Sequence, residues 1–115
     1  MTGRRNWSDP YPESVTSARP ARFEGGLLIT GLPGFHSSLA HLVVSSEQLV
    51  LEVVGWEHVF LRADLGVVGV RGTRPALIEI RRGRRQRAFQ FGPADGIEVV
   101  IDTLHAAGWR TLRYG

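Results

Sequence analysis

The chain has 115 residues, a formal net charge of +3 and no cysteine, and every basic residue apart from four histidines is an arginine. A chain of this length forms one domain and buries roughly two-thirds of the surface that its unfolded form exposes. The absence of cysteine excludes disulfides and thiolate zinc sites. There is neither an apolar run of about 18 residues that could span a membrane nor a signal peptide, so we expect a soluble, cytoplasmic protein.

Residues 1–20 are predicted to form a flexible tail, because prolines and serines are interspersed there without helical or strand periodicity. Segments with so few apolar residues do not bury enough surface to offset the entropy lost on ordering. Trp7 and Tyr11 are the exceptions. They are either loosely tethered or part of a short motif that docks on a partner or on the chain's own domain.

Short apolar runs cut by turn residues fill the segment from His41 to Phe91. Turn signals at intervals of about 8–12 residues are typical of an antiparallel sandwich or barrel. The first four strands are predicted at Arg22–Thr30 (with a bulge or bend at Gly25-Gly26), Leu39–Val44, Gln48–Val54 and around Val59–Leu61. Gly31–Ser38 is predicted to be a loop. The register between the third and fourth strands stays open. A two-residue turn at Gly55-Trp56 and a bulged turn shift the pairing by one residue, so they place different side chains on the buried face of the fourth strand.

A further hairpin is predicted around Gly83-Arg84, which fits a two-residue type II′ turn. Apolar residues alternate on the strand at 76–80 and again at Phe89 and Phe91. The turn would pair Ile78 with Phe89, and the apolar residues of both strands would then share one face.

An amphipathic helix is predicted over Pro93–Ala107, beginning either at Pro93 or with Asp95 as its cap. Gly108 suits the left-handed position after the last turn, with Trp109 lying over the helix in a Schellman motif. We expect residues 110–115 to be a short loose end. The helix has one apolar stripe at positions i, i+3, i+4 and i+7, formed by Ile97, Val100, Ile101 and Leu104.

Three segments of the chain resemble the small bacterial PH-like and GRAM-like domains of the pleckstrin-homology superfold. They are the strand–turn–strand run Leu42–Leu51, the segment Leu61–Val68, and Phe89-Gln90-Phe91 before the helix. The resemblance implies a PH-like domain over residues 21–109, mainly β with one C-terminal α-helix, as a seven-stranded antiparallel bent barrel capped by that helix. The family's phosphoinositide site usually lies by the first inter-strand loop. Since Gly31–Ser38 contains no arginine, that site does not carry over.

The strongest local feature is an arginine-rich hairpin tip. Guanidinium groups match the geometry of phosphate oxygens, so the tip is a candidate site for phospholipid headgroups or nucleic acid. Alternatively, it is a solvated hairpin whose charges keep a sheet edge from pairing. Trp56, predicted at another hairpin tip, is either an exposed anchor for a protein partner or a side chain that folds back on the barrel. The arginines are Arg81, Arg82, Arg84, Arg85 and Arg87.

No catalytic or metal signature is present. His36 and His41 do not have the spacing of a paired metal site, and Ser37 lies in a Gly-rich loop rather than in a nucleophile elbow. We therefore predict a non-enzymatic binding or regulatory module without cofactor or metal, whose first candidate partner is a protein. An anion-binding module that contacts phospholipid or nucleic acid through the arginine hairpin is the second reading, and a small hydrolase or metal-dependent enzyme is the third. The sequence does not indicate the oligomeric state.

Overall fold

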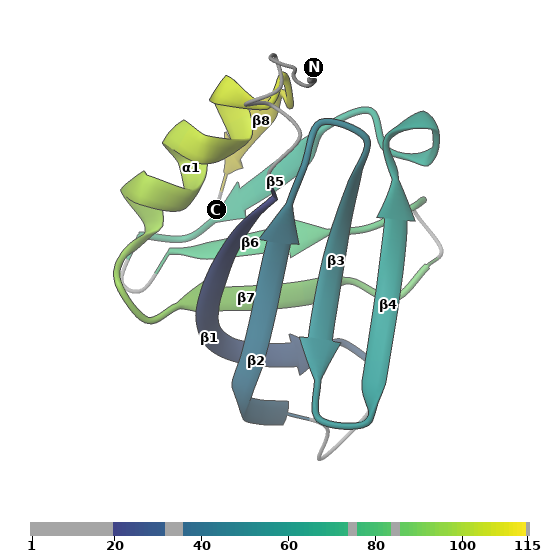
Figure 1. The fold of residues 1–115 in the computed structure, drawn as a ribbon, viewed down its shortest axis with the longest axis vertical. Coiled ribbons are helices and arrows are strands. Elements are labelled where there is room, and N and C mark those ends of the chain that lie inside the picture. Colours follow the sequence, from purple (N-terminus) through teal and green to yellow (C-terminus); the bar gives the residue numbers. More distant parts are fainter. Residues whose placement is uncertain (1–19, 32–35, 74–75, 84–85, 115) are drawn as a thin grey trace, which may run out of the picture.

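The computed structural model describes residues 20–31, 36–73, 76–83 and 86–114, and these form one strongly bent sheet with one α-helix and a short 3-10 helix at Arg62–Asp64 (Figure 1). The predicted tail before residue 20 and the core of the predicted first loop, residues 32–35, lie outside the described residues. Eight strands follow the order β4-β3-β2-β1-β7-β6-β5-β8, where seven were expected. The strands are β1 Ala21–Ile29, β2 His36–Val44, β3 Gln48–Val53, β4 Trp56–Leu61, β5 Val68–Arg71, β6 Leu77–Ile80, β7 Phe89–Pro93 and β8 Thr111–Tyr114, and the helix α1 spans Ile97–Ala106.

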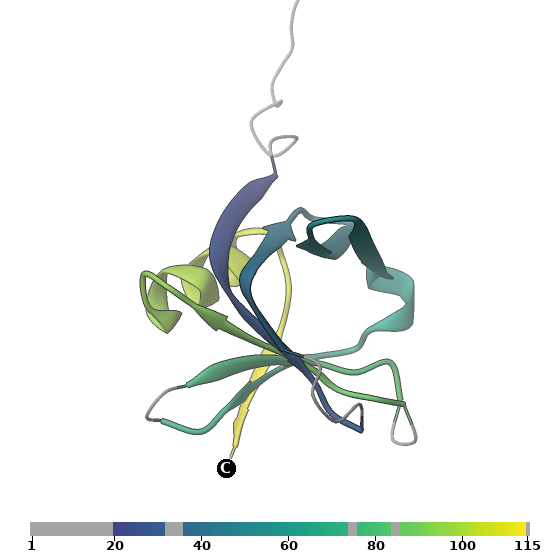
Figure 2. The ribbon, with the colours of Figure 1, turned by 90° about the horizontal axis from the view of Figure 1, so that it is seen from below.

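Strand β1 joins the two halves of the sheet. Its residues pair with β2 on one side, and its second half also pairs with β7 on the other. The predicted bulge is confirmed, because the register with β2 shifts between Gly25 and Leu27. A Cβ on Gly25 would lie 2.2 Å from the carbonyl oxygen of Gly92, so only glycine allows β7 to approach this closely. The sheet bends here and curls around its inner face (Figure 2).

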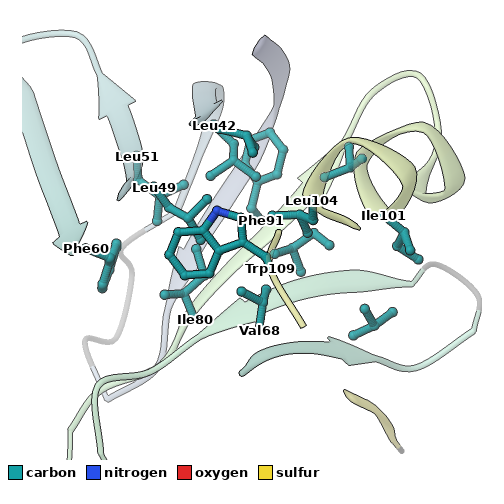
Figure 3. Packing of buried hydrophobic residues seen from close by; sticks show 14 of the residues in the cluster. Leu42, Leu49, Leu51, Phe60, Val68, Ile80, Phe91, Ile101, Leu104 and Trp109 are labelled. Atoms are coloured by element: carbon teal, nitrogen blue, oxygen red, sulfur yellow. The ribbon is translucent and has the colours of Figure 1, made fainter. Parts of the chain in front are cut away.

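The apolar residues of both halves meet inside this curl (Figure 3). Leucines of β2 and β3 face Ile78 and Ile80 of β6 and Phe91 of β7 within one continuous core. Three of the four predicted stripe residues of α1 are buried in it, and Ile97 packs against it. The helix therefore covers apolar surface of the sheet. The fully buried side chains from β2, β3 and β4 include Leu42, Leu49, Leu51 and Phe60.

The end of α1 follows the predicted Schellman geometry. Gly108 has φ of 93°, the amide of Trp109 donates to the carbonyl of Leu104, and the amide of Gly108 donates to that of His105. The predicted start is wrong: α1 begins after Gly96 rather than at Pro93, which ends β7. No side chain caps the first turn, so Asp95 does not have the role expected of it.

Two further expectations are corrected. Ile78 pairs with Phe91 rather than with Phe89, because the connection between β6 and β7 is longer than a two-residue turn. The slip is two residues, so the same side chains still point inward. Residues 110–115 are not a loose end, because Thr111–Tyr114 forms β8 and pairs in parallel with β5.

The register that the sequence left open is now defined. Val53 pairs with Trp56, which places Val54 and Gly55 in the turn, and Leu49 pairs with Phe60. Gly55 has φ of 78°, a conformation that glycine adopts at little cost. Trp56 and Phe60 each lie two positions from His58 along β4, so the three side chains share one face of the strand.

Candidate functional site

Three aromatic side chains of β4 share one face of that strand. Trp56, His58 and Phe60 alternate along β4, and each contacts the ring of Phe89 on β7. The ring centroid of Phe89 is 6.2 Å from that of Trp56, 4.8 Å from His58 and 5.1 Å from Phe60. Offset and edge-to-face arrangements at these distances are favourable for aromatic pairs. Trp56 is therefore half-buried against the sheet and stacked on Phe89. This agrees with the second of the two predictions for Trp56, that its side chain folds back on the barrel.

Arg82 lies beside this aromatic face. Its Nη2 donates to the carbonyl oxygen of Val59 at 2.7 Å, and its guanidinium lies 5.1 Å from the ring centroid of Phe60. Strand β4 is an outer strand of the sheet, so the hydrogen bond occupies a carbonyl that no neighbouring strand reaches. Arg82 thus joins the segment after β6 to the edge of β4.

The segment between β6 and β7 is anchored at both ends. Near its start the Gln86 amide donates to the Gly83 carbonyl at 3.1 Å. At its end, both backbone polar groups of Ala88 are bonded to Thr30. The Thr30 amide donates to the Ala88 carbonyl, and the Ala88 amide donates to the Thr30 hydroxyl at 2.9 Å. These bonds fix the path that brings the segment next to β4.

A small cavity opens between β4 and this segment, which we call the β4 cavity. Its volume is about 190 Å³. Two aromatic rings and an imidazole form its apolar walls, and two guanidinium groups and an amide supply hydrogen-bond donors. Its lining residues are His58, Phe60, Arg82, Gln86, Arg87 and Phe89.

The surroundings of His58 disfavour its protonated form. Burial and, to a lesser extent, the charge of Arg82 lower the pKa of His58 below its ordinary value of 6.5. Its Nε2 is buried and has no hydrogen-bond partner in the described part of the chain. The positive charge of the β4 cavity therefore comes from Arg82 and Arg87, not from the imidazole.

The structure separates the predicted arginine cluster. Arg82 and Arg87 line the β4 cavity, whereas Arg81 lines a different cavity, with residues of β5 and β8. Arg84 and Arg85 lie outside the described residues. The three described arginines of the predicted tip therefore line two different cavities.

His58, Phe60, Gln86 and Phe89 are site residues that sequence reasoning did not identify. The available signal was the alternation Trp56-x-His58-x-Phe60, which puts three rings on one face once the segment is read as a strand. That β4 lies next to the segment after β6 depends on the curl of the whole sheet, and no local pattern encodes it.

The remaining candidates for chemistry have ordinary structural partners. His41 lies 3.7 Å from the carboxylate of Glu24, and the Ser37 hydroxyl accepts a hydrogen bond from the amide of Leu39. His36 begins β2, and its side chain lies outside the described residues. Among the residues that the structure does describe, no three metal-ligating side chains converge.

Comparison with known proteins leaves the family open: no protein-family model matches the chain, and no curated protein matches its sequence. Within the described ranges, α1 is ten residues long, and no helix has the length and apolar character needed to cross a bilayer.

Proposed function

We propose that the chain is a non-catalytic binding module with a PH-like fold, whose helix closes one end of the bent barrel. Its partner is a protein, and the contact is an acidic segment that places an apolar side chain in the β4 cavity. The fold proposal is supported by the mainly β sheet, its strong curl and the packing of α1 on the core. Strand β8, which follows the helix, is an addition to the architecture that the resemblance implies.

The observation that carries the proposed partner is the composition of the β4 cavity. Arg82 and Arg87 supply charge directly beside the rings of Phe60 and Phe89. A carboxylate next to an apolar side chain satisfies both features, since guanidinium binds carboxylate in a planar fork and aromatic walls favour apolar contact. Aromatic and arginine side chains in partly desolvated pockets are also the residues that dominate binding energy at protein interfaces.

A membrane surface or a nucleic acid fits the described arginines less well. Both present repeated phosphates, which are best matched by a continuous basic surface. Arg81 and Arg82 line separate cavities, so these two residues do not form a continuous basic surface. The positive groups at the β4 cavity therefore suit one or two carboxylates better than a row of phosphates.

Binding to defined probes tests the proposal. The purified chain is titrated with a short soluble peptide in which glutamates flank one phenylalanine, and with the same peptide carrying glutamine in place of glutamate. It is also titrated with phosphatidylserine vesicles and with mixed-sequence duplex DNA. Each titration is done at low and at high salt. We expect the acidic peptide to bind more tightly than the other three. We also expect Arg87→Gln to weaken its binding by roughly tenfold or more, as for the loss of a charged hydrogen bond.

Arg110→Gln is the matched control, because it removes one exposed arginine located after α1 and outside the β4 cavity. It should leave peptide affinity unchanged apart from a small loss of long-range attraction. Tighter binding of DNA or vesicles than of the peptide would replace this proposal by the anion-binding one. For DNA, the affinity should then fall by about 0.9 log units per phosphate contact for each tenfold rise in salt concentration. Equal affinity of Arg87→Gln and the unaltered chain for the acidic peptide would also contradict it.

A further inference from the structure

A second cavity lies on the outer face of the sheet, away from the core. It has a volume of about 350 Å³ and is formed by β5, β6 and the edge strand β8. We call it the Glu79 cavity. Its lining combines one carboxylate, two guanidinium groups, one phenol and apolar side chains: Val67, Gly69, Arg71, Glu79, Arg81, Leu112 and Tyr114.

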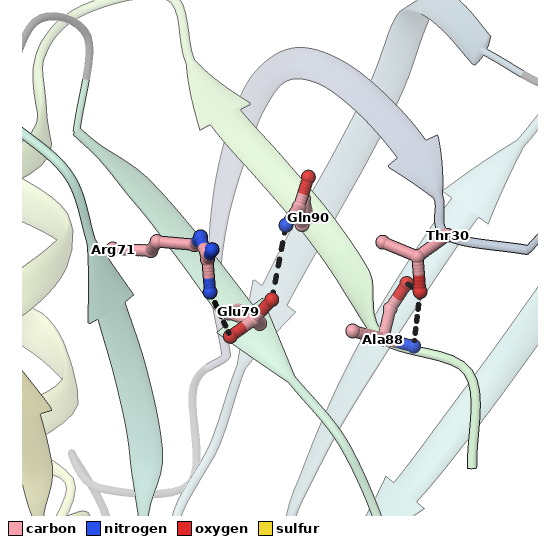
Figure 4. Close-up of polar contacts among 5 residues, drawn as sticks. All are labelled: Thr30, Arg71, Glu79, Ala88 and Gln90. Atoms are coloured by element: carbon pink, nitrogen blue, oxygen red, sulfur yellow. Dashed lines mark hydrogen bonds and ion pairs between the residues drawn. The ribbon is translucent and has the colours of Figure 1, made fainter. Parts of the chain in front are cut away.

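Glu79 is the one charged residue of the described chain that is buried, with its side chain only 4% exposed. Its Oε2 accepts a hydrogen bond from Nε2 of Gln90 at 2.9 Å (Figure 4). Its Oε1 lies 3.8 Å from Nη1 of Arg71, which is an ion pair but too long for a hydrogen bond. A buried carboxylate is costly unless it is both paired and hydrogen-bonded, so Oε1 retains capacity for a positively charged donor.

Tyr114 forms an aromatic wall beside this carboxylate. A Cβ at Gly69 would lie 2.9 Å from its ring, so the absence of a side chain there leaves room for the phenol against β5. The guanidinium of Arg71 lies 5.6 Å from the ring centroid of Tyr114 and is half-exposed. Leu112, 59% exposed, continues the apolar side of the cavity.

We propose that the Glu79 cavity binds a small zwitterion of the α-amino acid class. The ligand's ammonium group donates to Oε1 of Glu79, its carboxylate binds the guanidinium groups of Arg71 and Arg81, and its side chain lies against Tyr114 and Leu112. A simple anion would be repelled by Glu79, and a simple cation by the two arginines. Only a ligand carrying both charges side by side complements the one buried carboxylate and the two guanidinium groups.

Calorimetric titration and thermal unfolding with each of the common L-amino acids test this site. Acetate and methylammonium, each carrying one of the two charges, are the ligand controls. We expect saturable binding and a raised Tm for at least one amino acid, and neither effect for acetate or methylammonium at the same concentration. Arg71→Gln should weaken that binding by roughly tenfold or more.

Glu79→Gln should weaken amino acid binding as well, since the amide cannot ion-pair with the ammonium group. If Glu79→Gln fails to fold, Arg71→Gln still decides the question, because Arg71 is half-exposed. Arg113→Gln is the matched control. It also removes a half-exposed arginine, but this one lies on β8 and outside the cavity, so the variant should bind amino acids as the unaltered chain does. No binding of any amino acid, equal binding of acetate, or unchanged binding by Arg71→Gln would each overturn the proposal.

Discussion

At the scale of single residues, His58 is an ionisable side chain packed among aromatic rings, and burial lowers its pKa. It contacts the rings of Phe60 and Phe89 at 4.6 and 4.8 Å, and its buried Nε2 has no partner in the described chain. Protonation would place a second positive charge near Arg82. Neutral imidazole is therefore part of the packing at the β4 cavity.

The lowered pKa of His58 predicts how stability varies with pH. In the unfolded chain His58 takes up a proton near its ordinary pKa of 6.5, whereas the folded chain resists protonation until the pH is lower. The associated stability is fully present above pH 6.5 and is lost as the pH falls through the folded-state pKa. We expect the free energy of unfolding, measured by urea denaturation, to fall between about pH 7 and pH 5.

His58→Phe isolates this effect, because phenylalanine keeps an aromatic ring against Phe60 and Phe89 but does not titrate. Its stability should depend less steeply on pH over the same range. An identical pH slope in the two proteins would show that His58 is protonated as easily in the folded chain as in the unfolded one.

At the scale of elements, α1 is held by one buried stripe. Leu104 is fully buried, whereas Val99 on the opposite face is 55% exposed. Leu104→Asp would bury an unpaired charge in the core, and we expect it to destabilise the domain by about 4 kcal/mol or more or to unfold it. Val99→Asp, the same kind of change on the same helix, should cost far less. Circular dichroism during urea denaturation measures both, and similar stabilities for the two variants would mean that α1 is not docked on the sheet.

How far the sequence predicts these elements depends on how local their signals are. The strands β1 to β3, the glycine bulge and the Schellman end of α1 each reside in a few neighbouring residues, and all three were predicted. The register of β6 and β7 was two residues off, because Gly83-Arg84 looks like a tight turn although the chain uses a longer connection. Strand β8 has only four residues and no turn signal of its own. It is a strand because it pairs in parallel with β5.

The candidate site was predicted in part for the same reason. Arg82, Arg87 and Trp56 were identified from composition and position. Their aromatic neighbours were not, since Phe60 and Phe89 come from strands that meet only when the sheet curls. The sequence did not assign Arg81 and Arg82 to different cavities. Residues adjacent in the chain point to opposite faces of a sheet, and which surface each face contributes to is known only from the three-dimensional structure.

At the scale of the whole molecule, the curl of the sheet produces two surfaces with different chemistry. Where β4 approaches the segment after β6, rings and guanidinium groups form the β4 cavity. On the outer face of β5, β6 and β8, a buried carboxylate lies among guanidinium groups. The account's central claim is that the first of these surfaces binds the acidic segment of a protein partner.

Chemical-shift mapping tests that claim most directly. The ¹⁵N-labelled chain is titrated with the peptide in which glutamates flank one phenylalanine, and amide shifts are followed residue by residue. The account predicts saturable changes concentrated in β4 and in residues 86–89, together with the indole NH of Trp56, and their loss in Arg87→Gln. Changes concentrated on β5 and β8, changes scattered over the surface, or no changes at all would contradict it.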